Sequence, residues 1–210
     1  MNRSAKTITI LLALFLTLAA LVAEGWTGGW DRAVTATAVA GRTAFLSDVA
    51  QNVTTLGSDP MVILLSVLIL GYCLVAGLNR YVPALLGTPL AFLVGTVVKL
   101  VVARPRPDVA LIALPASYSF PSGHAVAASA FYLTLALLAS QAERRAAPRR
   151  LIVGAGIVVA LLVAWSRVYL GVHYLSDVVG GLLLGWTGAL GALMVVRRTE
   201  SRSDVQTRSG

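Results

Sequence analysis

Long apolar stretches alternate with short polar ones along most of this 210-residue chain. Each apolar stretch has about the length that an α-helix needs to cross the ~30 Å hydrocarbon core of a bilayer. The apolar positions run continuously instead of alternating with polar ones, which argues against membrane-spanning strands. The pattern therefore predicts an all-α bundle of six transmembrane helices. The six stretches are residues 7–23, 60–78, 82–102, 122–140, 151–170 and 175–196.

The connection between the first two predicted spans is long and carries a second kind of pattern. Within residues 24–59, apolar side chains recur at helical spacing with polar side chains between them. Such a segment favours an amphipathic helix that lies on the membrane surface, here on the outer face. The apolar positions are Leu46, Val49, Val53 and Leu56.

The composition agrees with a multi-pass membrane protein, since 57% of the residues are hydrophobic and 12% are charged. We expect one membrane domain over residues 1–198, followed by a polar tail, residues 199–210, that is disordered. The first stretch also has the basic start of a signal peptide. Leu21 stands where a cleavage site would need a small residue, so an uncleaved helix is favoured, with cleavage left open.

The positive charges predict the orientation of the chain in the membrane. Basic residues collect on the cytoplasmic side of membrane proteins. With the N-terminus inside, the whole net charge of +8 falls on the cytoplasmic segments, and the outer segments balance to zero. We therefore expect a plasma (inner) membrane protein with both termini in the cytoplasm. Because topology explains the charge, nucleic acid is not an expected partner, and no obligate protein partner is evident.

Three short polar runs interrupt the apolar pattern and contain both histidines of the chain. On the predicted topology, all three lie at the outer ends of the last four spans. Ionisable residues at membrane depth are costly and usually functional. The runs hold Lys99 and Arg106, then Ser122, Gly123 and His124, and finally Arg167, His173 and Asp177.

These runs resemble the motifs of the type 2 phosphatidic acid phosphatase superfamily, also called lipid phosphate phosphatases. The family pattern reads K-x6-RP, PSGH and SR-x5-H-x3-D, and all three motifs match in order. The resemblance implies a helical core shared with vanadium haloperoxidases and acid phosphatases. The matching residues are Lys99 with Arg106-Pro107, then Pro121-Ser122-Gly123-His124, then Ser166-Arg167 with His173 and Asp177.

The resemblance implies that His173 is the nucleophile, forming a phosphohistidine, and that His124 is the general acid. The residue types fit those roles. Asp177 follows His173 by four positions, so on a helix the two share a face, and its carboxylate can accept a hydrogen bond from Nδ1–H. This leaves Nε2 free to attack phosphorus. The helix start there also carries partial positive charge that favours phosphate.

Three cations, Lys99, Arg106 and Arg167, are candidates to bind the phosphoryl group with Ser122 and Gly123. A phosphoryl transition state spreads negative charge over three oxygens, and fixed positive charge stabilises it. We expect no metal and no other cofactor, because the arginines take the place of a divalent ion. Arg104 and Asp108 fall outside the motifs. They are interpreted as charges of the loop or as groups behind the site.

The predicted function is a membrane lipid phosphatase with its site on the outer face. It would hydrolyse a lipid phosphomonoester or pyrophosphate, of the undecaprenyl pyrophosphate, phosphatidylglycerol phosphate or phosphatidic acid type. A phosphotransferase that passes the phosphoryl to another acceptor remains an alternative. A transporter or scaffold is disfavoured, because the charges cluster at one face and the sequence has no repeat.

Overall fold

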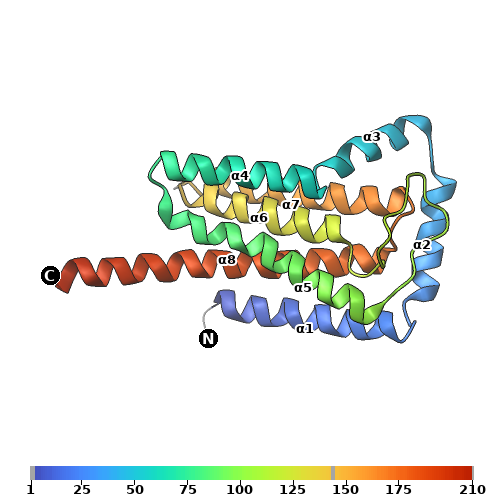
Figure 1. Cartoon of the computed structure of the whole chain (residues 1–210), viewed down its shortest axis with the longest axis horizontal. Coiled ribbons are helices and arrows are strands. Elements are labelled where there is room, and N and C mark those ends of the chain that lie inside the picture. The colour runs from blue at the N-terminus through green and yellow to red at the C-terminus, as the bar shows by residue number, and fades with distance from the viewer. Residues whose placement is uncertain (1–2, 143–144, 210) are drawn as a thin grey trace.

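The computed structural model describes residues 3–142 and 145–209, and over this part all of the regular secondary structure is helical. Most of the helices run side by side in a bundle (Figure 1). Their bounds are α1 Arg3–Ala23, α2 Gly28–Ala40, α3 Ala44–Thr55, α4 Asp59–Val75, the 3-10 helix η1 Asn79–Leu86, α5 Gly87–Val102, α6 Gly123–Ala142, α7 Ala146–Tyr169 and α8 Leu175–Ser209.

The bundle confirms the predicted all-helical membrane fold. Within the described ranges, five helices are long and apolar enough to cross a membrane, or six if α3 and α4 form one span bent by 44°. The predicted span over residues 82–102 is composite, because it consists of η1 followed directly by α5. α8 continues to Ser209, through the segment for which we expected a disordered tail.

The connection between the first two spans folds into two helices where the sequence predicted one. α3 covers the predicted amphipathic segment and begins at a Thr43 cap, whose side chain accepts a hydrogen bond from the Leu46 amide at 3.2 Å. α2 was not expected. It lies across the end of the bundle (Figure 1) and packs against α7 and α8.

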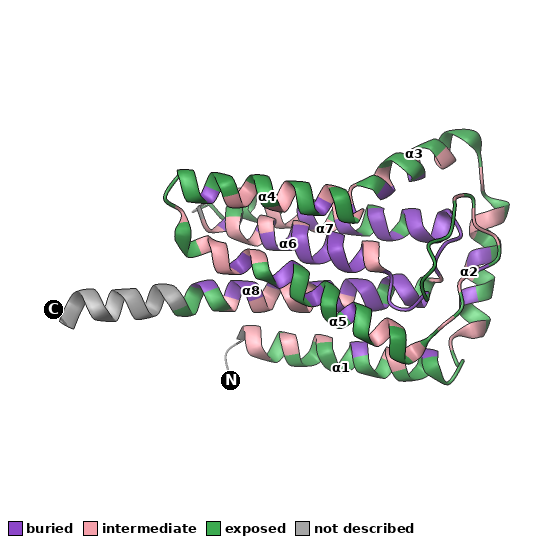
Figure 2. Cartoon of the chain, viewed as in Figure 1, coloured by how far each residue is buried: buried purple, intermediate pink, exposed green. Residues whose placement is uncertain are grey.

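The buried residues concentrate in α6, α7 and α8, toward the end that α2 covers (Figure 2). α6 and α8 approach closely because glycines face α6. A Cβ on Gly181 would lie 2.8 Å from the Ser122 carbonyl oxygen, and one on Gly185 would lie 2.6 Å from that of Val126. Small residues at a helix interface permit such close contact in membranes. The approach brings the start of α6 against the start of α8.

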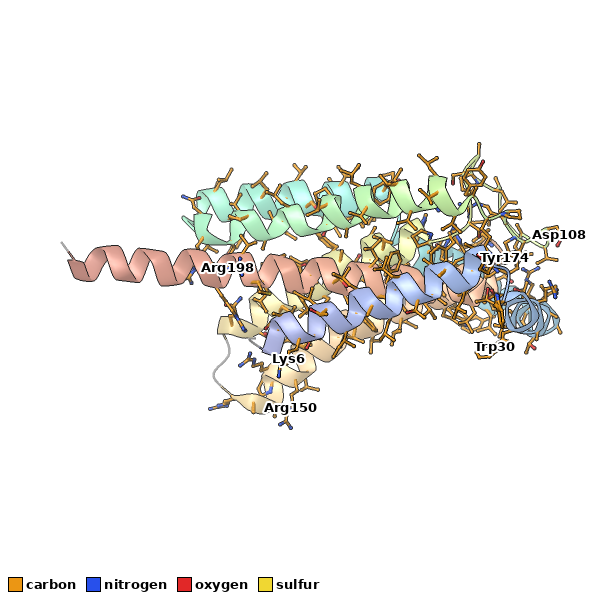
Figure 3. All side chains as sticks on the ribbon, turned by 90° about the horizontal axis from the view of Figure 1, so that it is seen from below. Lys6, Trp30, Asp108, Arg150, Tyr174 and Arg198 are labelled. Carbon is orange, nitrogen blue, oxygen red and sulfur yellow. The ribbon has the colours of Figure 1, made fainter. Side chains whose placement is uncertain are left out.

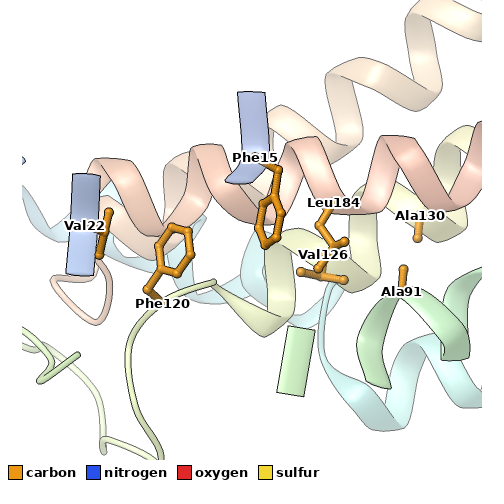
Figure 4. Close-up of a cluster of buried hydrophobic side chains, with 7 residues drawn as sticks. All are labelled: Phe15, Val22, Ala91, Phe120, Val126, Ala130 and Leu184. Carbon is orange, nitrogen blue, oxygen red and sulfur yellow. The ribbon is translucent and has the colours of Figure 1, made fainter. Parts of the chain in front are cut away.

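A cluster of buried apolar side chains fixes the segment between α5 and α6 to α1 (Figure 4). Within it, the rings of Phe15 and Phe120 stack with their centroids 6.0 Å apart. Phe120 is fully buried and immediately precedes the motif at residues 121–124. The motif is therefore held by apolar packing on one side and by α8 on the other. The cluster contains Phe15, Val22, Ala91, Phe120, Val126, Ala130 and Leu184.

The two ends of the bundle differ in character. α2, α3 and the segment between α5 and α6 lie at one end, whereas α1 begins and α8 ends at the other (Figure 1). Trp30, Asp108 and Tyr174 lie at the first end, and the cations Lys6, Arg150 and Arg198 lie toward the second (Figure 3). These three cations, which the sequence assigned to the cytoplasm, thus share one side of the fold.

Candidate active site

The structure brings the predicted site residues together at the end of the bundle that α2 covers. Each comes from a helix end or from the loop beside it, although the elements are far apart in the sequence. Lys99 lies in the last turn of α5, Arg106 in the following segment, Ser122, Gly123 and His124 at the start of α6, Arg167 in the last turn of α7, His173 between α7 and α8, and Asp177 in the first turn of α8.

His173 lies in a tight turn just before α8, so the prediction that it shares a helix face with Asp177 was wrong. Gly171 makes this turn possible, because its φ of +70° is a conformation that side-chain-bearing residues rarely adopt. A Cβ there would also lie 2.6 Å from the Val109 carbonyl oxygen. The turn is pinned by the Leu111 amide, which donates to the Leu170 carbonyl at 2.9 Å. The position of His173 is therefore determined by the backbone of this turn.

The imidazole of His173 is buried and bonded at both nitrogens. Nε2 lies 3.0 Å from Nη1 of Arg106. A guanidinium can only donate, so Nε2 accepts and the ring hydrogen sits on Nδ1. Nδ1 lies 3.3 Å from Oγ of Ser119 and 3.5 Å from Oδ2 of Asp177. Burial lowers the pKa of His173 to about 4, although Asp177 acts in the opposite direction. The ring is thus neutral at neutral pH, the form in which a nitrogen can attack phosphorus.

Ser119 is a site residue that sequence reasoning missed. Its hydroxyl donates to Oδ2 of Asp177 at 2.5 Å and can accept the hydrogen on Nδ1 of His173. The serine thereby adds a second link between the imidazole and the carboxylate, beside their direct approach at 3.5 Å. No motif signals it, because a serine in a loop carries no periodicity.

Asp177 is fully buried and bonded at both carboxylate oxygens. Oδ2 also accepts from the Tyr174 amide at 2.9 Å, and Oδ1 accepts from Nη1 of Arg104 at 2.7 Å. Its backbone carbonyl accepts from the Ser122 amide at 3.0 Å, which ties the start of α6 to α8. The orientation of the carboxylate is therefore determined by the surrounding structure.

Arg104 belongs to the site more closely than the sequence indicated. Its guanidinium bridges Asp177 and Asp31, at 2.7 Å to each. Asp31 lies in the first turn of α2 and is also buried. Sequence reasoning missed Asp31, because a lone aspartate in a half-polar segment looks like a surface acid. Asp108, by contrast, is exposed, as expected of a loop charge.

The start of α8 is occupied by carboxylates, which corrects the expectation that it faces phosphate. The Tyr174 amide donates to Asp177, and the Ser176 amide donates to Oδ1 of Asp31 at 3.0 Å. α6 differs, because it begins at Gly123 and the first amides of a helix have no acceptor within it. The start of α6 is therefore the helix end that is suited to an anion.

Two of the predicted phosphate-binding cations hold the loops around the site. The Lys99 ammonium donates to the carbonyls of Tyr118 and Pro121, both at 2.8 Å. Arg106 donates from Nε to the Ser117 carbonyl at 2.8 Å and from Nη1 to the Val172 carbonyl at 2.9 Å. Both cations thus shape the loops beside His173 as well as adding positive charge.

Arg167 and Ser122 each have a buried polar atom that makes no hydrogen bond within the described part of the chain. Arg167 is 3% exposed, and its Nη1 donates to Oγ1 of Thr54 on α3 at 2.7 Å. Its Nε is buried with no hydrogen-bond partner among the described residues, and the same holds for Oγ of Ser122. Buried polar atoms without partners are rare in proteins. These two groups are suited to receive the oxygens of a phosphate.

His124 lies near the cations of the site. The charges of Arg167, Arg106 and Lys99 act on its ring, and His173 belongs to the same neighbourhood. None of the residues that the structure describes forms a hydrogen bond with this ring. The backbone of His124 lies close to the α3–α4 connection, since a Cβ on Gly57 would lie 3.0 Å from its carbonyl oxygen.

An apolar groove of about 660 Å³ runs between α4 and α5 beside the start of α6. Phe92 lines it and also contacts the motif, because a Cβ on Gly123 would lie 3.6 Å from its ring. Ala127, one turn after His124, lines it as well. The groove thus reaches the residues next to the start of α6. Further lining residues are Val62, Ile63, Val67 and Leu93.

Comparisons with known proteins agree with this geometry. The chain is 34% identical over 182 residues to phosphatidylglycerophosphatase B of Bacillus subtilis, a match that covers 83% of the chain and 87% of the relative. It is 39% identical over 102 residues to an undecaprenyl-diphosphatase of Sulfolobus acidocaldarius, covering 46% of the chain and 45% of that protein.

The fold has a solved counterpart. The crystal structure of a transmembrane PAP2-type phosphatidylglycerolphosphate phosphatase from Bacillus subtilis superposes with a TM-score of 0.78 at 31% identity, and the match covers 93% of this chain and 96% of that one. The family model of the PAP2 superfamily matches residues 80–201, which include all three motifs. The chain therefore belongs to the PAP2 superfamily, whose members among its relatives are membrane phosphatases.

Proposed function

We propose that this protein is a lipid phosphatase that works through a phosphohistidine on His173 and needs no metal ion. The observation that carries the proposal is the state of the His173 ring. It is neutral, and its Nδ1 is held by Ser119 and Asp177. Its Nε2 faces the positively charged side of the site, where Arg106 lies 3.0 Å away.

In the first step, Nε2 of His173 attacks phosphorus and the bond between phosphorus and the leaving oxygen breaks. His124 gives its proton to that oxygen. Arg106, which now donates to Nε2, turns its N–H toward a phosphate oxygen and frees the lone pair. Nε of Arg167 and Oγ of Ser122, which have no partner among the described residues, donate hydrogen bonds to the other phosphate oxygens. Asp177 stabilises the positive charge that develops on the His173 ring.

In the second step, water replaces the leaving group. His124 removes a proton from the water, whose oxygen attacks phosphorus while the bond to Nε2 of His173 breaks. Inorganic phosphate leaves, and both histidines return to their starting states. Lys99 and Arg106 supply fixed positive charge near the phosphoryl oxygens throughout.

The substrate class follows from the site's surroundings. The groove beside Gly123 is almost wholly apolar and opens to the membrane, so it suits the hydrocarbon tail of a lipid. Phosphatidylglycerol phosphate is the first substrate to test, given the relative that matches most of this chain. Undecaprenyl pyrophosphate and phosphatidic acid follow. All three present a terminal phosphoryl group to His173.

We place the site at the outer face of the plasma membrane, with both termini in the cytoplasm and residues 1–198 as one domain. The distribution of charge supports this orientation. The basic side chains Lys6, Arg150 and Arg198 lie toward the end opposite to the site (Figure 3), and basic residues collect on the cytoplasmic side of membrane proteins.

The experiment that tests the function is phosphate release by the purified protein in mixed micelles with EDTA present. Phosphatidylglycerol phosphate, phosphatidic acid and undecaprenyl pyrophosphate should be compared. Release from at least one of them in EDTA is expected, and His173→Ala should abolish it. Free inorganic phosphate as the product separates hydrolysis from transfer to another acceptor. No release from any of the three, or release only with added divalent ions, would refute the proposal.

A further inference from the structure

We propose that Asp31, on the unexpected helix α2, is a positioning residue for catalysis. It holds Arg104 across the start of α8, so that Arg104 keeps the carboxylate of Asp177 in place behind His173. The inference rests on the proposed function and adds to it a residue that lies outside all three motifs.

All the side-chain hydrogen bonds of Asp31 point toward the catalytic end of α8. Oδ1 accepts from the Ser176 amide at 3.0 Å, and Oδ2 accepts from Oγ of Ser176 and from Nη2 of Arg104, both at 2.7 Å. The side chain is 2% exposed. A buried carboxylate is tolerated when it is paired and fully hydrogen-bonded, and costly otherwise. The carboxylate of Asp31 is therefore held in place by Ser176 and Arg104.

Arg104 transmits the position of Asp31 to Asp177. Nη1 donates to Oδ1 of Asp177 while Nη2 donates to Asp31. The guanidinium also stacks over the ring of Tyr174, with Cζ 4.2 Å from the ring centroid. A guanidinium is planar and its donors have a fixed geometry, so two carboxylates anchored on different helices fix its orientation. Without Asp31, Arg104 would keep its Nη1 bonds to Asp177 and to Oγ of Ser176, both 2.7 Å, but Nη2 would lose the carboxylate that anchors it to α2.

The charges behind His173 give Asp31 a second effect. Asp31 and Asp177 together carry two negative charges and Arg104 carries one positive charge, which leaves a net charge of −1. That sign stabilises the positive charge that His173 acquires when it attacks phosphorus. With Asp31 neutralised, Arg104 would offset Asp177 and the net charge would be zero. Arg106 lies at the other ring nitrogen of His173, and the charges of Arg106 and Arg167 act against the positive charge on this ring.

The test is Asp31→Asn, with Thr35→Val as the matched control. Thr35 lies one turn later on α2, and its Oγ1 is buried with no partner in the described part of the chain, so its loss leaves the network intact. In Asp31→Asn, kcat should fall about ten- to a hundred-fold while KM stays within about two-fold, as when a group that orients a catalytic side chain is lost. Thr35→Val should keep the wild-type kcat.

Active sites should be counted by titration with vanadate, so that kcat is expressed per intact site. A purely structural role would lower the number of vanadate-binding sites and leave kcat per site unchanged, and that result would overturn the proposal. A second variant, Arg104→Lys, keeps the charge but lacks the two-pronged geometry, so it should also lower kcat per site about ten-fold or more. If Asp31→Asn does not fold, kcat per site in Arg104→Lys tests the positioning role instead. Wild-type kcat per site in Arg104→Lys would then overturn the inference.

The inference and the proposed function can fail separately. If the wild-type protein turns over lipid phosphate and Asp31→Asn matches it per site, only the role of Asp31 is wrong. If the wild-type protein has no turnover on any of the three lipids, the proposed function fails, and the inference falls with it.

Discussion

Replacing Asp177 with Asn removes one negative charge while keeping the size of the side chain. In the wild-type structure, the carboxylate accepts from Arg104, Ser119 and the Tyr174 amide. An asparagine has one acceptor oxygen, so its NH2 group must face a donor on one of its two sides. Arg104 would keep only Asp31 as a charged partner.

The size of the effect follows from these contacts. Removing one partner of a buried ion pair costs roughly 3–5 kcal/mol of stability, and the bond to Asp31 should keep the loss near the lower end. The loss of activity should be larger. Neutralising the carboxylate behind a catalytic histidine lowers kcat about 10⁴-fold in a comparable carboxylate–histidine arrangement, which corresponds to roughly 5.5 kcal/mol. Substrate affinity should change little, because Asp177 faces the ring and not the phosphate.

The assay is steady-state phosphate release by Asp177→Asn, with thermal unfolding in detergent measured on the same samples. Ser119→Ala is the comparison variant, since it breaks the link between Nδ1 of His173 and the carboxylate but leaves the charge. It should lose less activity than Asp177→Asn. Turnover of Asp177→Asn within about ten-fold of wild type would refute the argument that negative charge behind His173 drives the first step.

His124→Ala should lose least on substrates with good leaving groups, such as an aryl phosphate, because these need little help from a general acid; equal losses on good and poor leaving groups would remove that role. Burial lowers the pKa of His173 from 6.5 to about 4, so protonation removes the nucleophile only below the usual range of histidine. After correction for the titration of the substrate itself, kcat/KM should therefore stay constant down to pH values near 5. A fall in kcat/KM that depends on His173 and has its midpoint at the ordinary histidine pKa would contradict this. A cysteine at position Ala110 should react with an impermeant thiol reagent added to intact cells, whereas one at Ala146 should not, and the reverse pattern would place the site in the cytoplasm.

The bundle and the motif residues were predictable because both depend on local signals. A run of apolar residues long enough to span a bilayer needs no tertiary information. The spacing of His173 and Asp177 is fixed by the motif, although the turn at Gly171 that presents the histidine was not foreseen. The break between η1 and α5 was also missed, since Pro83 and Gly87 interrupt the span without changing its apolar character.

The support around the site depends on contacts that the sequence does not encode locally. Asp31 and Arg104 are 73 positions apart in the sequence, and Asp31 lies on α2, a helix that the apolar pattern did not reveal. Lys99 was predicted to face phosphate, yet its ammonium binds backbone carbonyls, acceptors that every residue possesses. Residue types therefore indicated where the chemistry lies, whereas the partners of each charge required the fold.

The proposed phosphohistidine can be trapped and located directly. The purified protein should be incubated with a phosphoryl-radiolabelled lipid phosphate in EDTA, quenched in base and digested. We expect label that is stable in base and labile in acid on the peptide that contains His173. In His173→Ala, neither label nor phosphate release should remain. Label on another residue, or turnover that persists without His173, would show that His173 is not the nucleophile.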